Sequence, residues 1–483
     1  MSTAVPLSTA VSFWVAGKPV TSDATAVVRH SFDDSEAGVH FVPSSSDIET
    51  AVQAAHEVTE EFATLPAHVR AGALDHVSRT LGERSEELAQ LITAESGKPL
   101  KWARGEVGRA VSTFRWAAEE ARRFSGELQR LDTDPGGTGR LALVRRVPRG
   151  PVLGITPFNF PLNLVAHKVA PAIAVGAPIV LKPAPATPLT ALALGEILAS
   201  TDLPAGSWSI LPTDNEAAAA LVADPRLPVV SFTGSVPVGW GIRDSVPRKH
   251  VALELGGNAA VLVCPDWTDL DFAAQRIATF AMYQAGQSCI SVQRVYAHAD
   301  VFDALQEKVL EQVRALGTGN PRSDGVDVGP LINTAAAARV ESWVSDAVAA
   351  GGSLLLGGSR DGATVEPTVL AGVPEDASVM AEEVFGPVVS LTRVESVDEG
   401  VRLINDSRFG LQAGVFTRDL PTAFDVSARL RVGGVLVGDV PSFRADQMPY
   451  GGVKDSGVGR EGPASAMADF TEERVTVLTG LTL

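Results

Sequence analysis

The sequence predicts an α/β protein whose first large unit is a doubly wound parallel sheet of the nucleotide-binding type. Two observations carry this prediction: short apolar runs alternate with helix-like segments from residue 150 to 254, and a second alternation follows from 259 to about 445. Strand and helix in alternation form parallel βαβ units, because parallel neighbours need a crossover connection. The 483 residues suffice for about three domains or subdomains.

The N-terminal part is expected to contain strands followed by a helical layer. Residues 1–45 are rich in Ser, Thr and Val with short alternations, which indicates a frayed end and edge hairpins. The segment Ser46-Asp47-Ile48-Glu49 has the spacing of a capping box. Apolar residues recur at helical intervals over 47–64, 68–98 and 103–126, and a loop at 132–139 precedes a strand at 140–147.

The short apolar runs between residues 150 and 254 mark the expected strands, and the segments between them mark the expected helices. Thr187 and Pro188 are interpreted as the N-cap and the first-turn proline of one of its helices. The tail at 470–482 is again expected to be a strand. Strands are expected at 152–155, 178–181, 208–211, 229–232 and 251–254, with helices at 162–175, 188–200, 215–223 and 236–245.

Composition narrows the class of partner and the compartment. Forty basic against 57 acidic residues give a net charge of −17, which repels nucleic acid and anionic membranes. Cys264 and Cys289 cannot build a disulfide framework, and the eight histidines show no metal-binding spacing, so a reducing cytoplasm and no metal are expected. Neither a signal peptide nor a membrane span is expected, because residues 1–16 have no Lys or Arg before their apolar stretch and no apolar run approaches 18 residues.

Polar residues follow the ends of the predicted strands, where parallel sheets bind ligands. Asn159 lies in the turn Thr156-Pro-Phe-Asn-Phe-Pro161, whose rigidity can aim an amide N–H at an oxyanion. The alternative is an Asn that only caps its own turn. Lys182 ends another strand and is suited to donate to ribose hydroxyls, although a strand-ending Lys is usually just solvated.

Two glycine-rich segments receive different interpretations. Phe232-Thr-Gly-Ser235 ends a strand and opens a helix with Gly239 one turn in, so its backbone N–H groups could face a pyrophosphate. No Lys follows Gly239, so this is not a P-loop. The segment Gly457-Val-Gly459-Arg-Glu-Gly462 matches a dinucleotide fingerprint by its letters. Such a site needs a strand before it, a helix after it and a second strand with an acidic residue about 20 positions on, whereas the chain ends 21 residues after Gly462. The segment is interpreted as a turn.

Two side chains stand out as reactive. Glu254 ends the last strand of the first sheet beside Gly256 and Gly257, which implies access to the backbone. Cys289 lies in a turn after the helical stretch 268–285, where a thiol is more nucleophile-like than inside an apolar run. Cys264 lies in such a run and is interpreted as an inert core residue. Taken alone, Cys289 leaves a catalytic and a structural role equally open.

Together and in this order, the motifs resemble those of the aldehyde dehydrogenase family, and most closely its lactaldehyde, phosphonoacetaldehyde and semialdehyde dehydrogenase branch. The resemblance implies a cofactor domain (1–127 and 147–258), a catalytic domain (259–467) and a β-arm (128–146 and 468–483) that builds homodimers or homotetramers. The motifs are TPFNFP at 156–161, KPAPATP at 182–188, FTGS at 232–235, ELGG at 254–257, GQSC at 286–289, EEVFGP at 382–387 and PYGGVKDSGVGREG from 449.

The resemblance also implies the reaction, the oxidation of an aldehyde to a carboxylic acid with NAD or NADP. Cys289 falls on the nucleophile that forms a thiohemiacetal, Asn159 on the oxyanion-holding amide and Lys168 on a proton-relay position. Collapse of the oxyanion passes a hydride to the nicotinamide, and Glu254 falls on the base that hydrolyses the thioester. Cofactor contacts fall on Thr156, Pro157, Phe158, Lys182, Pro185, Gly234, Ser235, Gly239, Leu255, Gly256, Glu383 and Phe385.

The choice of cofactor and substrate is only partly implied. Pro185 stands where many NAD-preferring relatives carry a Glu that repels a 2′-phosphate, so measurable use of both nucleotides is expected.

The substrate tunnel is expected to be lined by Arg109, His167, Ser288 and Arg444, whose guanidinium groups suit an anionic end. The alternatives are arginines that pair with acids at the surface and a histidine packed within its helix. Relatives that handle a phosphoryl group often have Arg where this chain has Ser288. A short polar or singly anionic aldehyde is therefore favoured over a long apolar or aromatic one.

Two other functions are weighed. One is a coenzyme A-acylating aldehyde dehydrogenase, in which a thiol resolves the thioester, and a hydrolytic base such as Glu254 argues against it. The other is a catalytically silent relative with a structural or binding role. The presence of Cys289, Glu254 and Asn159 argues against that second alternative.

Overall fold

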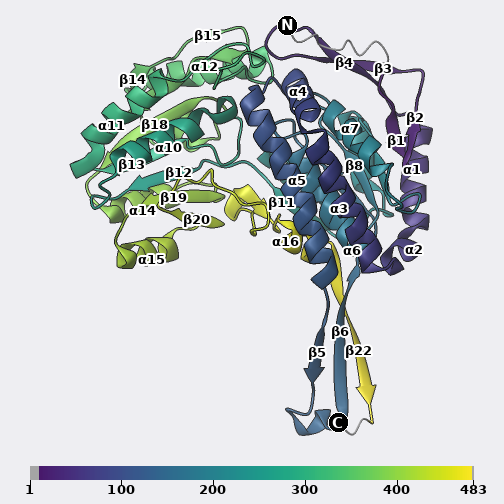
Figure 1. Cartoon of the computed structure of the whole chain (residues 1–483). Coiled ribbons are helices and arrows are strands. Elements are labelled where there is room, and N and C mark those ends of the chain that lie inside the picture. Colours follow the sequence, from purple (N-terminus) through teal and green to yellow (C-terminus); the bar gives the residue numbers. More distant parts are fainter. Residues whose placement is uncertain (1–9, 481–483) are drawn as a thin grey trace.

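A computed structural model describes residues 10–480 as two α/β bodies with a slender three-stranded arm (Figure 1). Residues 1–9 and 481–483, which include the frayed N-terminal end and the last residues of the expected arm, lie outside the described residues. The predicted fold class is confirmed. Within the described chain, no helix combines the length and the apolar character needed to cross a bilayer.

The first body is built on an eight-stranded sheet with the order β2-β1-β9-β8-β7-β10-β11-β21. The five central strands, β9, β8, β7, β10 and β11, are parallel. Antiparallel strands lie at both edges of the sheet, β1 beside β9 and β21 beside β11. Gly457 pairs with Glu254 at one edge, so the glycine-rich segment that was expected to be a turn begins as a two-residue edge strand of this sheet. The strands are β1 (Phe13–Val15), β2 (Lys18–Val20), β7 (Val152–Ile155), β8 (Ile179–Lys182), β9 (Trp208–Ile210), β10 (Val229–Thr233), β11 (His250–Glu254) and β21 (Gly457–Val458).

Helices cover this sheet, and Figure 1 shows α3, α5 and α6 side by side in front of it. The crossover helices are α6 (Asn163–Val175), α7 (Leu189–Leu198), α8 (Asn215–Ala223) and α9 (Val236–Ser245), as predicted. Two predicted long helices are each divided in two, at Val58 and at Arg84, while the apolar periodicity continues. Arg84 leaves the helical region with φ −96° and ψ 18°, whereas Val58 stays close to it with φ −80° and ψ −5°. The N-terminal helices are α1 (Ser45–Glu57), α2 (Thr59–Thr64), α3 (Ala67–Glu83), α4 (Ser85–Ser96) and α5 (Leu100–Arg123).

The capping box of α1 lies two residues before the predicted one. Ser44, rather than Ser46, is the N-cap, and its hydroxyl accepts a hydrogen bond from the backbone N–H of Asp47. The carboxylate of Asp47 accepts in return from the backbone N–H of Ser44 at 2.8 Å. The prediction was wrong because it required a Glu at the third helical position, and the shorter Asp closes the box equally well.

Thr187 is not the N-cap of α7, which begins at Leu189 with Pro188 at the cap position. The first N–H groups of α7 donate instead to the buried carboxylate of Glu95 on α4, at 2.7 and 3.1 Å. Glu106 on α5 does the same for α6, because its Oε1 accepts from two N–H groups at 2.9 and 3.1 Å. Carboxylates at helix N-termini satisfy free donors and face the positive end of the helix dipole.

Glu106 also forms a fully buried ion pair with Lys98, in which neither side chain is exposed. We expect Glu106→Gln to lower the free energy of unfolding by about 3–5 kcal/mol, because it leaves a buried ammonium without its countercharge. Chemical denaturation measures the change. Glu86→Gln, which removes an exposed partner of Arg104, is the matched control and should change little. Equal stability of the two variants would contradict this account of the core.

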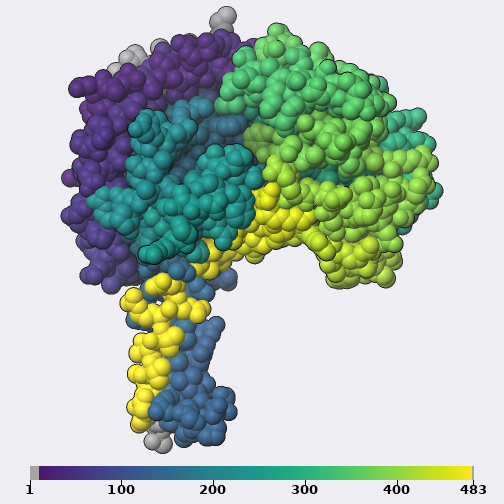
Figure 2. Space-filling model, turned by 180° about the vertical axis from the view of Figure 1, so that it is seen from behind, coloured from purple at the N-terminus to yellow at the C-terminus, as the bar shows by residue number. Residues whose placement is uncertain are grey.

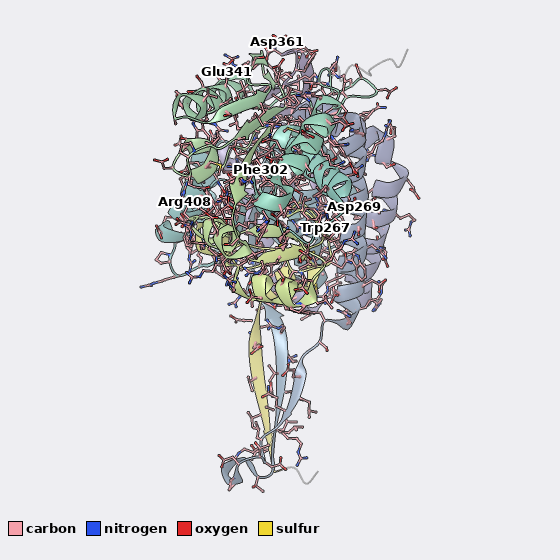
Figure 3. The ribbon with its side chains drawn as sticks, turned by 90° about the vertical axis from the view of Figure 1, so that its left-hand side faces the viewer. Trp267, Asp269, Phe302, Glu341, Asp361 and Arg408 are labelled. Carbon is pink, nitrogen blue, oxygen red and sulfur yellow. The ribbon has the colours of Figure 1, made fainter. Side chains whose placement is uncertain are left out.

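The second body contains a seven-stranded sheet with the order β14-β17-β18-β13-β12-β19-β20, parallel except for β14. It has a hydrophobic core of its own, in which Cys264 is buried as expected. Trp267 and Asp269, labelled in Figure 3, precede α10, and Asp269 caps that helix. The strands are β12 (Ala260–Val263), β13 (Arg294–His298), β14 (Ser353–Leu356), β17 (Thr368–Ala371), β18 (Val388–Val394), β19 (Gln412–Phe416) and β20 (Gly434–Val437).

The remaining elements are the helices of the second body, one further helix on the first body and two small hairpins. The helices of the second body are α10 (Leu270–Met282), α11 (Ala299–Arg314), α12 (Thr334–Ala349), α13 (Ser378–Ala381), α14 (Val397–Asn405) and α15 (Leu420–Arg429). Helix α16 (Pro463–Asp469) packs on α6 of the first body. Two hairpins stand outside the large sheets: β3 (Thr25–Arg29) with β4 (Glu36–Phe41), and β15 (Arg360–Asp361) with β16 (Thr364–Val365).

The arm is an antiparallel sheet of β5 (Glu127–Arg130), β6 (Arg140–Pro148) and β22 (Thr471–Thr479). Figure 2 shows the C-terminal segment lying between the two bodies before it runs down the arm. Val475 and Val477 are 57% and 49% exposed on β22. The arm therefore has solvent-exposed apolar side chains in this single chain.

Candidate active site

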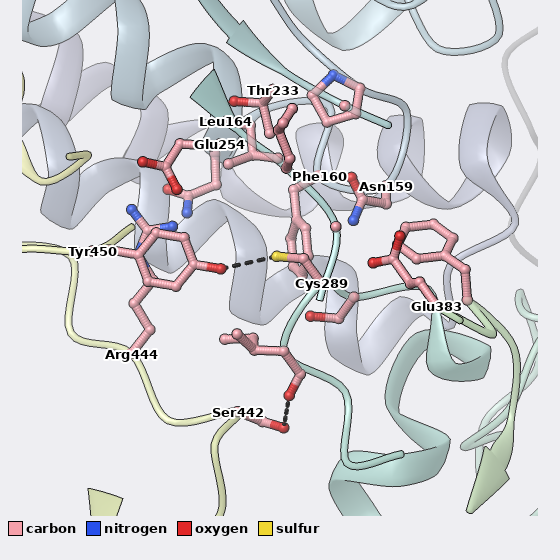
Figure 4. Close-up of a pocket in the computed structure, with 18 of the residues that line it drawn as sticks. Asn159, Phe160, Leu164, Thr233, Glu254, Cys289, Glu383, Ser442, Arg444 and Tyr450 are labelled. Atoms are coloured by element: carbon pink, nitrogen blue, oxygen red, sulfur yellow. Dashed lines mark hydrogen bonds between the residues drawn. The ribbon is translucent and has the colours of Figure 1, made fainter. Parts of the chain in front are cut away.

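A cavity of about 520 Å³ lies where the two bodies meet, and its wall contains Cys289 (Figure 4). Its walls come from the carboxyl ends of β10 and β11, the turn before α6, the loop after α10 and the segment that follows β20. The predicted site residues in the wall are Arg109, Pro157, Phe158, Asn159, Gly234, Ser235, Glu254, Leu255, Gly256, Ser288, Cys289, Glu383, Phe385 and Arg444.

The loop that carries Cys289 is shaped by unusual backbone geometry. Gln284 and Ala285 have φ values of 52° and 54°, in the left-handed region that non-glycine residues rarely adopt. Gly286 follows with φ 69°, and a Cβ there would lie 1.9 Å from the carbonyl oxygen of Gly386. Only glycine fits this approach. The loop ends the helical run of α10 and turns the thiol of Cys289 into the cavity.

Asn159 is tied to the same loop. Its Nδ2 donates to the carbonyl of Gln287 at 2.9 Å, and Gln284 donates back to the carbonyl of Asn159. An amide nitrogen carries two N–H groups, so Asn159 retains one donor after its bond to Gln287. The turn and the nucleophile loop are thus held together across a separation of more than a hundred residues.

Cys289 is surrounded by groups that act on its charge. Its Sγ lies 2.9 Å from the hydroxyl oxygen of Tyr450. Burial raises the pKa of the Cys289 thiol, and the Tyr450 hydrogen bond acts in the opposite direction. The carboxylates of Glu383 and Glu254 favour the neutral thiol, while the guanidinium of Arg444 favours the thiolate.

Glu254 is a buried carboxyl at the end of β11, and neither of its oxygens has a hydrogen-bond partner among residues 10–480. Burial raises the pKa of Glu254 well above its usual range, and the nearby charge of Glu461 adds to the shift. The charges of Arg444 and Lys168 oppose it. A high-pKa carboxyl with free lone pairs in a cavity wall is suited to accept a proton.

Lys168 and His167 lie behind the cavity wall rather than in it. Lys168 donates to the hydroxyls of Ser231 and Thr233 at 3.0 and 2.8 Å, and its Nζ lies 3.5 Å from Glu461. His167 lies 3.1 Å from a carboxylate oxygen of Asp446. Burial and the charge of Arg444 lower the pKa of His167 to about 4, so this imidazole is neutral at pH 7.

The two arginines differ in how their donors are used. Arg109 directs both of its hydrogen bonds to one oxygen of Asp446, at 2.9 and 3.2 Å. Arg444 is 5% exposed, and its Nη2 donates to Glu461 at 3.0 Å. The buried Nε of Arg444 has no acceptor in the part of the chain that the structure describes. Arg444 therefore contributes to the wall of the cavity a guanidinium group that retains one buried, unused donor.

The predicted cofactor residues occupy the carboxyl edge of the first sheet and the facing wall. Glu383 accepts a hydrogen bond from the N–H of Gly257 at 3.0 Å, and a Cβ at Gly256 would lie 2.3 Å from its other oxygen. The ring of Phe385 meets that of Phe158 edge-on at 5.9 Å. A carboxylate, a small-residue edge and apolar rings suit the ribose and base of a dinucleotide.

Four of the predicted cofactor residues stand outside the cavity wall. Thr156 and Lys182 lie together at the ends of β7 and β8, where the N–H of Thr156 donates to the carbonyl of Lys182 at 3.2 Å. Pro185 is exposed beyond that edge. Gly239 packs against Leu255, because a Cβ there would lie 2.4 Å from that side chain. The absence of a side chain at Gly239 thus lets α9 pack closely against the segment that follows β11.

Tyr450, Glu461 and Asp446 were missed by the sequence reasoning. Tyr450 and Glu461 belong to the motif that begins at 449, of which the part from 457 to 462 was interpreted only as a glycine-rich turn. Nothing in the spacing placed the Tyr450 hydroxyl beside a thiol 161 positions away. The signal that could have found them is the presence of an aromatic and an acid within a long, ordered motif that no regular element explained.

A profile of the aldehyde dehydrogenase family matches residues 20–476. The chain belongs to the aldehyde dehydrogenase family. A 3-sulfolactaldehyde dehydrogenase of Priestia aryabhattai is 41% identical over 466 residues, covering 96% of this chain and 97% of the relative. The resemblance seen in the motifs is thereby confirmed, and the protein oxidises aldehydes with NAD or NADP.

Solved structures of aldehyde dehydrogenases have the same fold as this chain. An aldehyde dehydrogenase of Physcomitrella patens, in complex with the reaction product succinate, is 44% identical with a TM-score of 0.97 and 99% coverage of both chains. An NADP-dependent glyceraldehyde-3-phosphate dehydrogenase of Bacillus halodurans, complexed with NADP, is 34% identical with a TM-score of 0.93, covering 98% of this chain and all of that one.

Proposed function

We propose that this enzyme oxidises a short, singly anionic or hydroxylated aldehyde to the carboxylic acid, through a covalent intermediate on Cys289. The observation that carries the proposal is the buried Nε donor of Arg444 without a partner among the described residues, in the same wall as the thiol. Guanidinium groups bind carboxylates and related oxyanions in a forked geometry. The names of two relatives, one for a sulfonated aldehyde and one for a succinate complex, support an anionic substrate.

The residues of the chain account for the covalent half-reaction. The Cys289 thiolate attacks the aldehyde carbon, and the free N–H of Asn159 donates to the oxyanion of the thiohemiacetal. Such a donor stabilises the transition state by about 3–4 kcal/mol. When bound, NAD or NADP is the two-electron acceptor of the reaction. Glu383, Ser235 and Lys182 are the polar residues proposed to hold it.

Hydrolysis of the thioester is assigned to Glu254. Its carboxylate takes a proton from the water that attacks the thioester carbon, because its oxygens have no partner among the described residues that competes for the proton. Lys168 and Glu461 lie next to each other behind it, and they provide the proposed relay for that proton. A base with this role supports hydrolysis of the thioester to the acid rather than transfer of the acyl group to a thiol such as coenzyme A.

The arrangement of domains is proposed from the same resemblance. Residues 1–127 and 147–258 form the proposed cofactor domain, 259–467 the catalytic domain, and 128–146 with 468–483 the oligomerisation arm. The exposed valines of β22 support an arm that pairs with further copies of this chain in a dimer or tetramer. A reducing compartment such as the cytoplasm is proposed because both cysteines are free.

The test compares kcat/KM for succinic semialdehyde, lactaldehyde, hexanal and benzaldehyde. We expect the wild type to prefer the first two, and Arg444→Lys to lose about tenfold or more on succinic semialdehyde relative to hexanal. Lys retains the charge that faces Glu461 but not the Nε donor. Arg444→Ala and Arg109→Ala extend the series.

Arg276→Ala is the matched control. Arg276 lines the same cavity, but its Nε and Nη2 already donate to the two carboxylate oxygens of Asp439, at 2.7 and 2.9 Å. This control should leave the order of substrates unchanged. A preference for hexanal or benzaldehyde, with changes in discrimination below about threefold, or about 0.65 kcal/mol, in the Arg444 and Arg109 variants would contradict the proposal.

A further inference from the structure

Tyr450 lies beside the reactive sulfur, and the surrounding chain fixes its position. Its hydroxyl oxygen is 2.9 Å from Sγ of Cys289 (Figure 4). Its backbone forms a bridge with Glu461, in which each N–H donates to the other's carbonyl at 2.9 and 2.6 Å. The guanidinium of Arg444 lies over the ring, 3.9 Å from its centre. The backbone bridge and the stacked cation thus position the hydroxyl independently of Cys289.

The charges around the pair favour Tyr450 as the donor. Burial raises the pKa of the Tyr450 phenol well above its usual range, and a charge on Cys289 would raise it further, so the phenol keeps its proton. The groups that face the thiol are Tyr450 and Arg444, which favour the thiolate, and Glu383 and Glu254, which oppose it. Within residues 10–480, Tyr450 is the hydrogen-bond partner of Sγ.

We propose that Tyr450 is a further catalytic residue, whose O–H donates a hydrogen bond to the Cys289 thiolate and increases the fraction of enzyme ready to attack an aldehyde. The inference rests on the proposed role of Cys289 as nucleophile. When Sγ bonds to the aldehyde carbon, the carbonyl π pair moves to oxygen and the sulfur loses its charge. The phenol proton stays on Tyr450 throughout, so no group is transferred to or from this residue.

The hydrogen bond has two opposite effects on the rate. A bond from a neutral donor to a charged acceptor changes the thiolate fraction by about tenfold or more. A more stable thiolate is also a weaker nucleophile, with a Brønsted coefficient of about 0.5, which offsets about threefold of that gain. The net benefit is about threefold at any pH where the thiol predominates.

The test measures alkylation of Cys289 by iodoacetamide between pH 6 and 10, without aldehyde or cofactor, and counts Cys264 separately by peptide mass spectrometry. We expect Tyr450→Phe to slow alkylation about threefold at pH 7 and to displace the pH profile upward by about one unit. Tyr283→Phe is the matched control, because Tyr283 lines the same cavity and has no hydrogen bond to Cys289. The control should leave the profile unchanged.

A second variant keeps the inference testable if Tyr450→Phe fails to fold. Incorporation of 3-fluorotyrosine in place of Tyr450 makes the hydroxyl a stronger donor of nearly the same size, so it should speed alkylation at pH 7. A space-filling role predicts the reverse for Phe, since removal of a hydroxyl that covers Sγ would speed the reaction. Equal or faster alkylation of Tyr450→Phe at every pH would overturn the inference. Failure to alkylate Cys289 in the wild type would instead contradict the proposed nucleophile.

Discussion

Replacement of Cys289 by Ala is expected to lower aldehyde-dependent reduction of NAD or NADP by about a thousandfold or more. Without the thiol, no covalent intermediate forms, and the cavity retains only its binding and oxyanion groups. An absorbance assay of reduced cofactor measures the loss. The cavity wall and the buried charges are unaffected by the removal of one sulfur, so the variant should still fold and bind cofactor.

Cys264→Ala is the matched control for this experiment. Cys264 is 1% exposed in the core of the second body, and burial raises the pKa of its thiol to about 12. We expect the control to keep most of its activity, with a modest loss of stability from the lost sulfur. Comparable turnover by Cys289→Ala and the wild type would contradict the covalent mechanism.

The second large effect is expected for Glu254→Gln, which removes the proposed base without changing the size of the side chain. Thioester formation should continue while its hydrolysis slows by about 10²–10⁴-fold, the usual contribution of a general base. A burst of reduced cofactor would then precede a slow steady phase in stopped-flow absorbance. Because the pKa of Glu254 is raised, the steady rate of the wild type should increase with pH as this carboxyl loses its proton, and the variant should lose that dependence.

Two controls separate this role from others. Glu383→Gln changes a carboxylate in the same cavity that is assigned to cofactor binding, so it should raise the KM for the nucleotide without producing a burst. Addition of coenzyme A should leave the slow phase of Glu254→Gln unchanged if water is the natural acceptor. Equal losses in burst and steady rates would require another role for Glu254.

Much of the fold could be predicted because its signals are local. The apolar runs of β7, β8 and β10 are buried on both faces, so each stands out as a short uninterrupted block between helices. The breaks at Val58 and Arg84 could not be predicted, since the apolar stripe continues across them. The cap of α7 was also out of reach, because its acceptor, Glu95, belongs to a distant helix.

The residues of the candidate site also differ in whether a local sequence signal indicates them. Cys289, Glu254 and Asn159 each follow a recognisable turn or strand end, so their residue types could be interpreted before any contact was known. Tyr450 contacts Cys289 across 161 positions of the chain, and such a contact leaves no periodic pattern in a single sequence. The expectation that Arg109 and Arg444 reach the cavity describes their position well, while their pairing with Asp446 and Glu461 emerged only from the structure.

The most direct test of the central claim is the mass of the Cys289 peptide. Glu254→Gln is mixed with succinic semialdehyde and NADP, quenched in acid during the burst and digested for mass spectrometry. The account predicts that the peptide with Cys289 gains the acyl group of the aldehyde, and that the adduct is absent without NADP and in the double variant that also carries Cys289→Ala. Accumulation of reduced cofactor with an unmodified Cys289 peptide would contradict the proposed thioester.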